Sequence, residues 1–283
     1  MGNYKLIPYI ANELRSEGHE CIMLQQLNGR PFNQQYVDTI KAHNFDAIYY
    51  EMLDSETFKI VEQLSESKRI LCYASKGILP DFESILDHKG TYYDSVLTNS
   101  LTMIDRFNAN GVECRHFKFY PAPLFESEIR TDRKYSHDFT YLGGGFQRIS
   151  SNLYDKEREL IYANPLVHKY GAGWSGVPSY HGVLPPEDIG ALYHSSTYSL
   201  ATIEPAQRAM GMINNRYCEI AKSRSSIISV DYPEMDFFGL EEFVIFATDP
   251  DLTRITDRTD TDRAYEFIMD KERDFFTSLK ELL

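Results

Sequence analysis

The 283-residue sequence lacks the features that mark several large classes of protein. No apolar run approaches the roughly 18 residues that would cross a membrane, and no cationic segment followed by an apolar one opens the chain, as in a secretory signal. The formal net charge of −13 gives no basic footprint of the kind that generic nucleic-acid binders carry. These absences favour a cytoplasmic protein with no membrane span.

Cysteine and metal-binding motifs are also scarce. The four cysteines form no CxxC pair, which argues against a structural zinc site and against a disulfide framework. There is no clear Asp-x-Asp motif in a loop, because Asp260-Thr261-Asp262 lies at the start of the expected last helix, where acidic residues complement the helix dipole. The sequence therefore predicts no metal site and no cofactor.

What the chain does have is a regular alternation of strand-like and helix-like segments, with 42% hydrophobic residues to build its cores. This pattern predicts an α/β fold with mostly parallel sheets. The expected strands are residues 21–24, 46–50, 69–73, 95–98, 115–119, 138–142, 167–170, 198–201, 226–230 and 243–247. The expected helices are residues 6–14, 37–42, 56–65, 100–108, 154–162, 186–195, 215–223 and 262–283.

A break near the middle divides this pattern in two. Pro121-Ala122-Pro123 interrupts the alternation, and residues 124–137 are polar and charged like a linker. The length suits two ordinary domains, so we expect an N-terminal domain at 1–125 and a C-terminal domain at 126–283. The last helix, from about residue 262 to 283, is expected to pack back on the first domain.

Two segments of the second half have the chemistry of a phosphate site. Gly143-Gly144-Gly145 directly follows a strand, so its backbone amides could approach a diphosphate closely. The alternative is a turn that binds no ligand. Arg148 follows and either reaches the same phosphates or is a solvated surface residue.

The expected helix at 215–223 is the second such segment. Asn214 and Asn215 lie where the helix begins, and Asn is a favoured N-cap residue. Arg216 and Glu219 are three positions apart and share a helical face. A helix N-terminus and a guanidinium both suit phosphate, and a carboxylate one turn later suits ribose hydroxyls. The alternatives are an intrahelical ion pair for Arg216 and a solvent-facing role for Glu219.

Several motifs in the second half resemble a known family. In order and spacing, they are similar to GT-B glycosyltransferases of group 1, in particular the spore-maturation-type branch. The matching segments are 141–145, 168–174, 180–183, 189–193 and 215–221, with looser likeness at 12–20 and 93–100.

The resemblance implies an activity. Two Rossmann-like domains would face a cleft, with the acceptor on the first and a nucleotide sugar on the second. The sugar would pass from a UDP- or GDP-sugar donor to an acceptor hydroxyl on a glycan, a protein or a modified nucleic acid, without a metal. A sugar-nucleotide epimerase of the same fold and a non-catalytic nucleotide-binding module are the alternatives.

The resemblance also implies site residues. Arg216 would neutralise the leaving diphosphate. Glu51 and Asp54, which follow an expected strand, are candidates for the base that takes the acceptor proton, with loop carboxylates as the alternative. Trp174 either plugs the core or walls the nucleotide pocket, and we favour the core. The implied donor-binding residues are Gly143, Gly144, Gly145, Arg148, Tyr170, Gly171, His181, Asn215, Arg216 and Glu219.

The chain departs from the family pattern at two places. It begins at Met1-Gly2-Asn3, already at the turn that follows the first strand of such folds, so we expect that strand to be missing and its neighbours to need another partner. Many retaining members carry a Glu eight positions before the residue that matches Glu219, where this chain has Gly211. Retaining or inverting stereochemistry is therefore not assigned.

Overall fold

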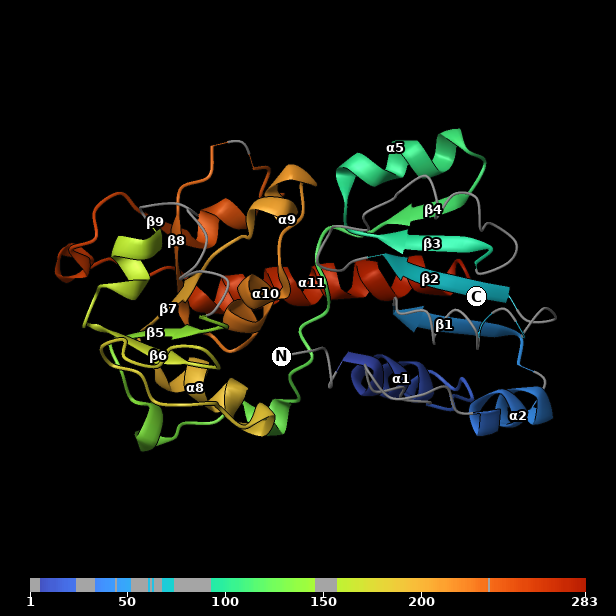
Figure 1. Cartoon of the computed structure of the whole chain (residues 1–283), viewed down its shortest axis with the longest axis horizontal. Coiled ribbons are helices and arrows are strands. Elements are labelled where there is room, and N and C mark those ends of the chain that lie inside the picture. Colours follow the sequence, from blue (N-terminus) through green and yellow to red (C-terminus); the bar gives the residue numbers. More distant parts are fainter. Residues whose placement is uncertain are drawn as a thin grey trace. The chain divides into compact units, whose positions relative to one another are not determined.

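The computed structural model describes residues 6–23, 34–43, 45–51, 61, 63, 68–73, 93–145, 157–233 and 235–283 (Figure 1). The chain forms two compact units. Unit 1 comprises residues 1–20, 121–205 and 213–272, and unit 2 comprises residues 21–120, 206–212 and 273–283. Each unit therefore combines segments from both sides of residue 125, the boundary expected from the sequence.

Unit 1 contains a five-stranded parallel sheet in the order β6-β5-β7-β8-β9. Every residue of β5, β7 and β8 is buried, as in parallel sheets that are covered on both faces. This confirms the α/β class and the strands expected there. The strands are β5 Phe139–Leu142, β6 Val167–Tyr170, β7 Tyr198–Ala201, β8 Ser226–Val230 and β9 Val244–Ala247.

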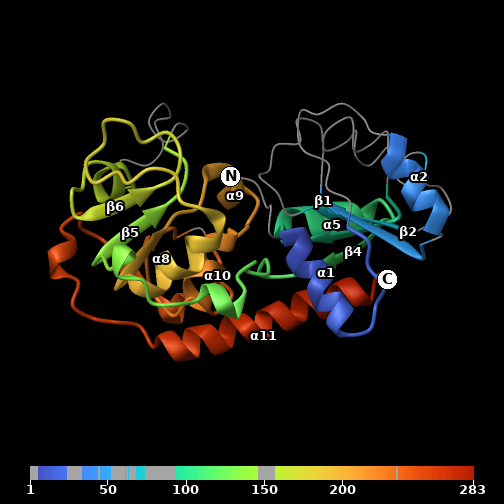
Figure 2. The same ribbon diagram turned by 90° about the horizontal axis from the view of Figure 1, so that it is seen from below.

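Helices pack around this sheet. Figures 1 and 2 show α10 lying beside α11 within unit 1. The α-helices of unit 1 are α1 Leu6–Ser16, α8 Ile189–Ser195, α10 Asn215–Lys222 and α11 Thr261–Lys280, which ends in unit 2, whereas α9 Pro205–Ala209 belongs to unit 2 from Ala206 on. The short helical turns are η1 Glu126–Glu128, η2 Arg133–Tyr135, η3 Arg158–Tyr162, η4 Pro186–Asp188, η5 Leu240–Phe243 and η6 Leu252–Arg254.

Local sequence explains where α1 and α10 begin or end. The side chain of Asn214 accepts a hydrogen bond from the Arg216 amide at 3.0 Å, which confirms the expected N-cap. Helix α1 stops where Gly18 takes φ +97° and the His19 amide donates to the Leu14 carbonyl, the usual glycine-terminated helix end. An N-cap asparagine and a glycine with positive φ therefore account for the start of α10 and the end of α1.

A buried ionic network joins α1, α10 and α11 in unit 1. The Lys222 Nζ donates to both carboxylate oxygens of Glu272, to the Tyr9 hydroxyl at 2.7 Å and to the Ala122 carbonyl. Tyr9 in turn donates to Glu272. The side chains of Lys222 and Glu272 are only 2% and 4% exposed. Because every member has partners, the charges can be kept out of water.

Unit 2 contains a four-stranded parallel sheet in the order β1-β2-β3-β4. Its core includes Tyr50, Tyr93, Val96 and Phe107. The described strands hydrogen-bond in chain order, so the gap expected from a missing first strand does not occur among them. The elements are α2 Gln34–His43, β1 Ala47–Glu51, β2 Lys68–Tyr73, β3 Ser95–Thr98, α5 Leu101–Ala109 and β4 Glu113–His116.

Two expected strands of the first half need correction. Residues 21–23 are not a strand, and Ile22 and Met23 are 38% and 40% exposed, so this short apolar run is not buried as a parallel strand would be. Leu24 lies outside the described residues. The strand expected at 115–119 is β4 and spans residues 113–116, because its partner β3 ends at Thr98, opposite His116.

The described helices include none with the length and apolar character needed to cross a membrane. Even α11, which has 20 residues, carries charged side chains along its length.

Candidate functional site

The carboxyl ends of β5 and β7 and the first turn of α10 meet at one edge of the unit 1 sheet. Strand β5 leads into Gly143 and strand β7 into Thr202, and the two strands are parallel neighbours. The Asn214 side chain donates to the Thr202 carbonyl and so holds the start of α10 at this edge. Sites in α/β proteins form at such carboxyl edges.

Arg216 lies at the centre of this edge. Its guanidinium is 5.1 Å from the Tyr141 ring centroid, and its Nη1 donates to the Tyr141 hydroxyl at 3.4 Å. Burial disfavours the guanidinium charge, but Tyr141, Tyr193 and the nearby carboxylates outweigh this effect and raise the pKa of Arg216 above its usual range. Arg216 is therefore a half-buried cation held against aromatic rings.

Tyr193, on α8, adds a buried hydroxyl to the same place. The side chain is fully buried, and burial followed by the charge of Glu219 raises its pKa. The hydroxyl lies beside Arg216 but makes no hydrogen bond of normal geometry with any described residue. Buried hydroxyls usually find a partner, and the group nearest to this oxygen among those that shift its pKa is the Arg216 guanidinium, so Tyr193 is a candidate for positioning Arg216.

Glu219 and Asn215 form the other side of the site. The Glu219 Oε1 accepts a hydrogen bond from the Asn215 Nδ2 at 3.1 Å, and both residues are half-buried. The carboxylate is thus held one turn after the start of α10. Asn215 and Glu219, both predicted from the sequence, contact each other directly.

Two glycines of the predicted phosphate loop, Gly143 and Gly145, pack closely against the neighbouring loop at residues 171–173. The amides of Gly143 and Gly145 donate to the carbonyls of Tyr170 and Ala172, at 2.9 and 2.8 Å. A Cβ on Gly145 would lie 2.3 Å from the Gly173 carbonyl oxygen, and one on Gly171 would lie 2.2 Å from that of Gly143. Only glycine allows this close packing of the two loops.

Gly144 differs from the other two glycines of this loop. It is exposed, and nothing lies within 4 Å of the position that its Cβ would take. Since the Gly143 and Gly145 amides are already used within unit 1, Gly144 is the part of the loop best placed to meet a ligand.

Trp174 belongs to the core, as the sequence favoured. It is fully buried, and its Nε1 donates to the Gly143 carbonyl at 2.6 Å. The indole therefore holds the glycine loop through this hydrogen bond from the core.

Tyr170 and His181, both expected in the donor pocket, make their contacts elsewhere. The Tyr170 hydroxyl lies 2.8 Å from the Nε2 of His137. The His181 Nε2 lies 2.7 Å from the Nδ1 of His168, and the His181 ring stacks on Tyr170. These contacts tie both residues to a group of three histidines, His137, His168 and His181, which we call the histidine cluster.

The remaining predicted residues are only partly described. Glu51 is the last residue of β1, at the carboxyl edge of the unit 2 sheet, but its side chain is outside the described residues. Asp54 and Arg148 also lie outside them.

The sequence reasoning did not single out Tyr141 or Tyr193 as residues beside Arg216. One signal was present for Tyr141: a tyrosine within a fully buried strand needs a partner for its hydroxyl.

The comparisons with known proteins concern the fold. No protein-family model matches the chain, and neither does any curated protein. Among solved structures, a DNA-modifying beta-glucosyltransferase, determined with and without its substrate uridine diphosphoglucose, gives a TM-score of 0.53 at 10% identity, covering 97% of this chain and 89% of that chain. The chain has the GT-B fold.

Two other structures agree with this result. The glycosylation-associated Gap123 complex of Streptococcus agalactiae gives a TM-score of 0.52 at 12% identity. The match covers 88% of this chain and 56% of that chain, so this chain spans little more than half of its length. A Listeria monocytogenes protein assigned as a UDP-N-acetylglucosamine 2-epimerase gives 0.52 at 10% identity, over 94% of this chain and 84% of that chain. The GT-B fold predicted from the sequence is thus confirmed.

Proposed function

We propose that the chain is a cytoplasmic glycosyltransferase that moves a sugar from a nucleotide-diphosphate sugar to an acceptor hydroxyl. The observation that carries the proposal is the position of Arg216, a half-buried cation in the first turn of α10 at the carboxyl edge of the unit 1 sheet. The GT-B fold supports the proposal, as does the sequence resemblance to the spore-maturation-type branch.

The diphosphate would bind at the start of α10. Free backbone N–H groups and the positive end of the helix dipole attract anions there, and the Arg216 guanidinium adds planar donors that match phosphate oxygens. The buried Tyr193 hydroxyl beside Arg216 would help to position the guanidinium for the diphosphate. Gly144, which follows β5 at the same edge of the sheet, offers an exposed backbone.

The ribose would bind one turn further along α10. The Glu219 carboxylate, held by Asn215, can accept hydrogen bonds from two neighbouring hydroxyls. The sequence leaves uracil and guanine open as the base, so we propose UDP or GDP as the nucleotide of the donor.

The transfer step would use Arg216 as an electrostatic catalyst. The bond between the anomeric carbon and the diphosphate oxygen breaks, the acceptor oxygen bonds to that carbon, and a base takes the acceptor proton. Negative charge develops on the leaving diphosphate, where Arg216 stabilises it. Because Arg216 and the helix dipole supply positive charge, we propose transfer without a metal, with Glu51 or Asp54 as the base.

Calorimetry with UDP and with GDP tests the binding half of the proposal. One nucleotide should bind, and both Arg216→Ala and Glu219→Ala should weaken it, whereas Arg254→Ala should not, because that side chain is 73% exposed on unit 1. An isotherm unchanged by both site variants would refute the donor site.

A screen of donor hydrolysis across nucleotide sugars tests the reaction. An epimerase of the same fold would convert the donor to another sugar nucleotide with no acceptor present, and a binding module would leave every donor intact. Product analysis therefore separates the three activities, and added EDTA should leave transfer unchanged.

A further inference from the structure

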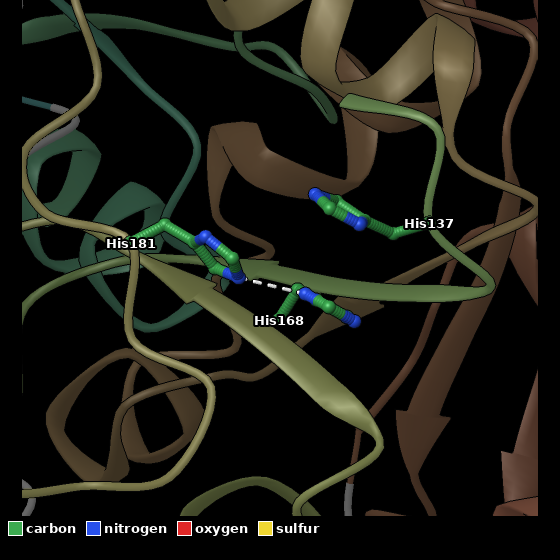
Figure 3. A group of neighbouring side chains, drawn as sticks. All are labelled: His137, His168 and His181. Atoms are coloured by element: carbon green, nitrogen blue, oxygen red, sulfur yellow. Dashed lines mark hydrogen bonds between the residues drawn. The ribbon is translucent and has the colours of Figure 1, made fainter. Parts of the chain in front are cut away.

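The histidine cluster brings together three segments of unit 1 that are distant in sequence. His137 precedes β5, His168 is the second residue of β6, and His181 follows Tyr180, which forms a bridge with β6. The rings of His137 and His168 stack with centroids 3.8 Å apart, and those of His168 and His181 are 4.9 Å apart. Each ring offers a nitrogen, and these nitrogens all lie within 4.8 Å of one another (Figure 3).

We propose that the histidine cluster binds one divalent transition-metal ion of the zinc class, with His137, His168 and His181 as its protein ligands. Imidazole nitrogen is the ligand that zinc, copper and nickel share. Three histidines plus a water molecule complete a tetrahedral site.

The nitrogens are near enough for one ion to bridge them once the rings turn. Imidazole lone pairs lie in the ring plane, and His137 and His168 now stack with 10° between their planes, so these rings must rotate before their nitrogens converge. Zn–N bonds of about 2.1 Å hold the nitrogens of a tetrahedral site about 3.4 Å apart. The hydrogen-bonded nitrogens of His168 and His181, now 2.7 Å apart, would separate slightly, and the widest pair would close. His181 is exposed and is followed by Gly182 at φ +92°, so its ring can adjust.

The surroundings of the cluster favour an ion. The Tyr170 hydroxyl at 2.8 Å from His137 Nε2 can orient that ring through a hydrogen bond, as outer partners of metal-bound histidines do. Asp138 lies close enough to His137 and His168 to attract positive charge there.

The ion would be bound by residues other than Arg216, Asn215 and Glu219. The contacts that form the cluster link His137, His168, His181 and Tyr170, and none of these contacts involves the three residues of α10. A metal there would fasten the edge strand β6 to the segments on either side of it.

Metal titration of untagged, EDTA-stripped protein tests this proposal. Zn²⁺ measured by calorimetry should bind with a stoichiometry of one, Co²⁺ should give the visible absorption of a tetrahedral site, and Zn²⁺ should raise Tm. His168→Ala and His181→Ala should each weaken Zn²⁺ binding by at least about 100-fold, since each removes one ligand of three. His43→Ala, an exposed histidine on α2, is the matched control.

The proposal is overturned if neither ion binds, or if His168→Ala and His181→Ala bind Zn²⁺ like the parent protein. It is also overturned if His43→Ala weakens binding as much as they do. Should His168→Ala fail to fold by circular dichroism, the exposed His181→Ala variant decides. Because the readout is metal binding alone, the result is independent of whether the chain transfers a sugar.

Discussion

The two ends of α10 carry basic residues in opposite surroundings. Lys222, in the last turn, is buried, and its Nζ donates hydrogen bonds to Glu272, Tyr9 and the Ala122 carbonyl. Arg216, in the first turn, is half-buried beside a hydroxyl with no described hydrogen-bond partner. A cation near the C-terminus of a helix complements the dipole, while one at the N-terminus opposes it.

This difference suggests how a charged residue that stabilises the fold can be told from one that binds a ligand: by its partners and by its position on the helix dipole. Lys222 is favoured by both the dipole and its partners, so it stabilises the fold of unit 1. Arg216 is held against the dipole, next to Tyr141 and Glu219, and an anionic ligand would relieve that opposition. Substitutions should therefore separate the two residues: loss of Lys222 should lower stability, and loss of Arg216 should weaken ligand binding.

The largest effect is expected at Lys222. Lys222→Met should lower the free energy of unfolding by about 3–5 kcal/mol, because it leaves the Glu272 carboxylate buried without its cation. Urea unfolding measures this. The double variant Lys222→Met with Glu272→Leu should be markedly more stable than the single variant, since no unpaired charge remains, and equal stability of the two would contradict the ionic account.

Arg216→Ala should have the reverse profile. We expect nucleotide binding to weaken by about 10- to 100-fold, as loss of charge-assisted hydrogen bonds worth roughly 1.5–3 kcal/mol implies. The free energy of unfolding should change by less than about 1 kcal/mol. Arg216→Lys, which keeps the charge but loses the planar donor fork, should fall between the two. A loss of stability as large as that of Lys222→Met would assign Arg216 to the fold instead.

Tyr193→Phe should separate stability from binding more finely. Removing a buried hydroxyl that has no described partner should leave the ligand-free protein equally stable, or more stable by up to about 1 kcal/mol. Nucleotide binding should weaken by a few fold. Thermal unfolding with and without UDP or GDP provides both values, and a clear loss of stability without the nucleotide would mean that the hydroxyl is satisfied inside the fold.

The smallest expected effect is a pH dependence in unit 2. Burial, aided by Lys118, lowers the pKa of His116 below its ordinary 6.5. As pH falls through 6.5, the unfolded chain takes up the proton first, so this residue's contribution to stability is lost on acidification. His116→Gln should therefore show a shallower fall in stability between pH 7.5 and 5.5 than the parent protein. An unchanged slope would mean that His116 keeps its ordinary pKa.

Sequence reasoning located the strands of unit 1 well because buried parallel strands appear as short apolar runs between turn residues. It placed 167–170, 198–201 and 226–230 where β6, β7 and β8 lie. The apolar run at 21–24 has the same local appearance, yet residues 21–23 form no strand, since pairing requires a neighbour that local sequence does not reveal.

Local spacing predicted the Asn214 cap, which the structure confirms. The hydrogen bond between Asn215 and Glu219 was not predicted, although four positions along a helix bring such side chains together. Tyr141 lies on β5 and Tyr193 on α8, so spacing along α10 could not predict that they lie beside Arg216. The three histidines also lack the spacing of a known metal motif, because they meet only when β5, β6 and the segment around Tyr180 align.

The sequence by itself determined the alternation of strands and helices, the ends of α1 and the start of α10. Each of these depends on residues a few positions apart, whose geometry the backbone fixes locally. Only the tertiary structure decided which charges are fully buried with partners and which are half-buried beside aromatic rings. Lys222 is 50 positions from Glu272 and 213 from Tyr9, and such contacts exist only after the whole of unit 1 has packed.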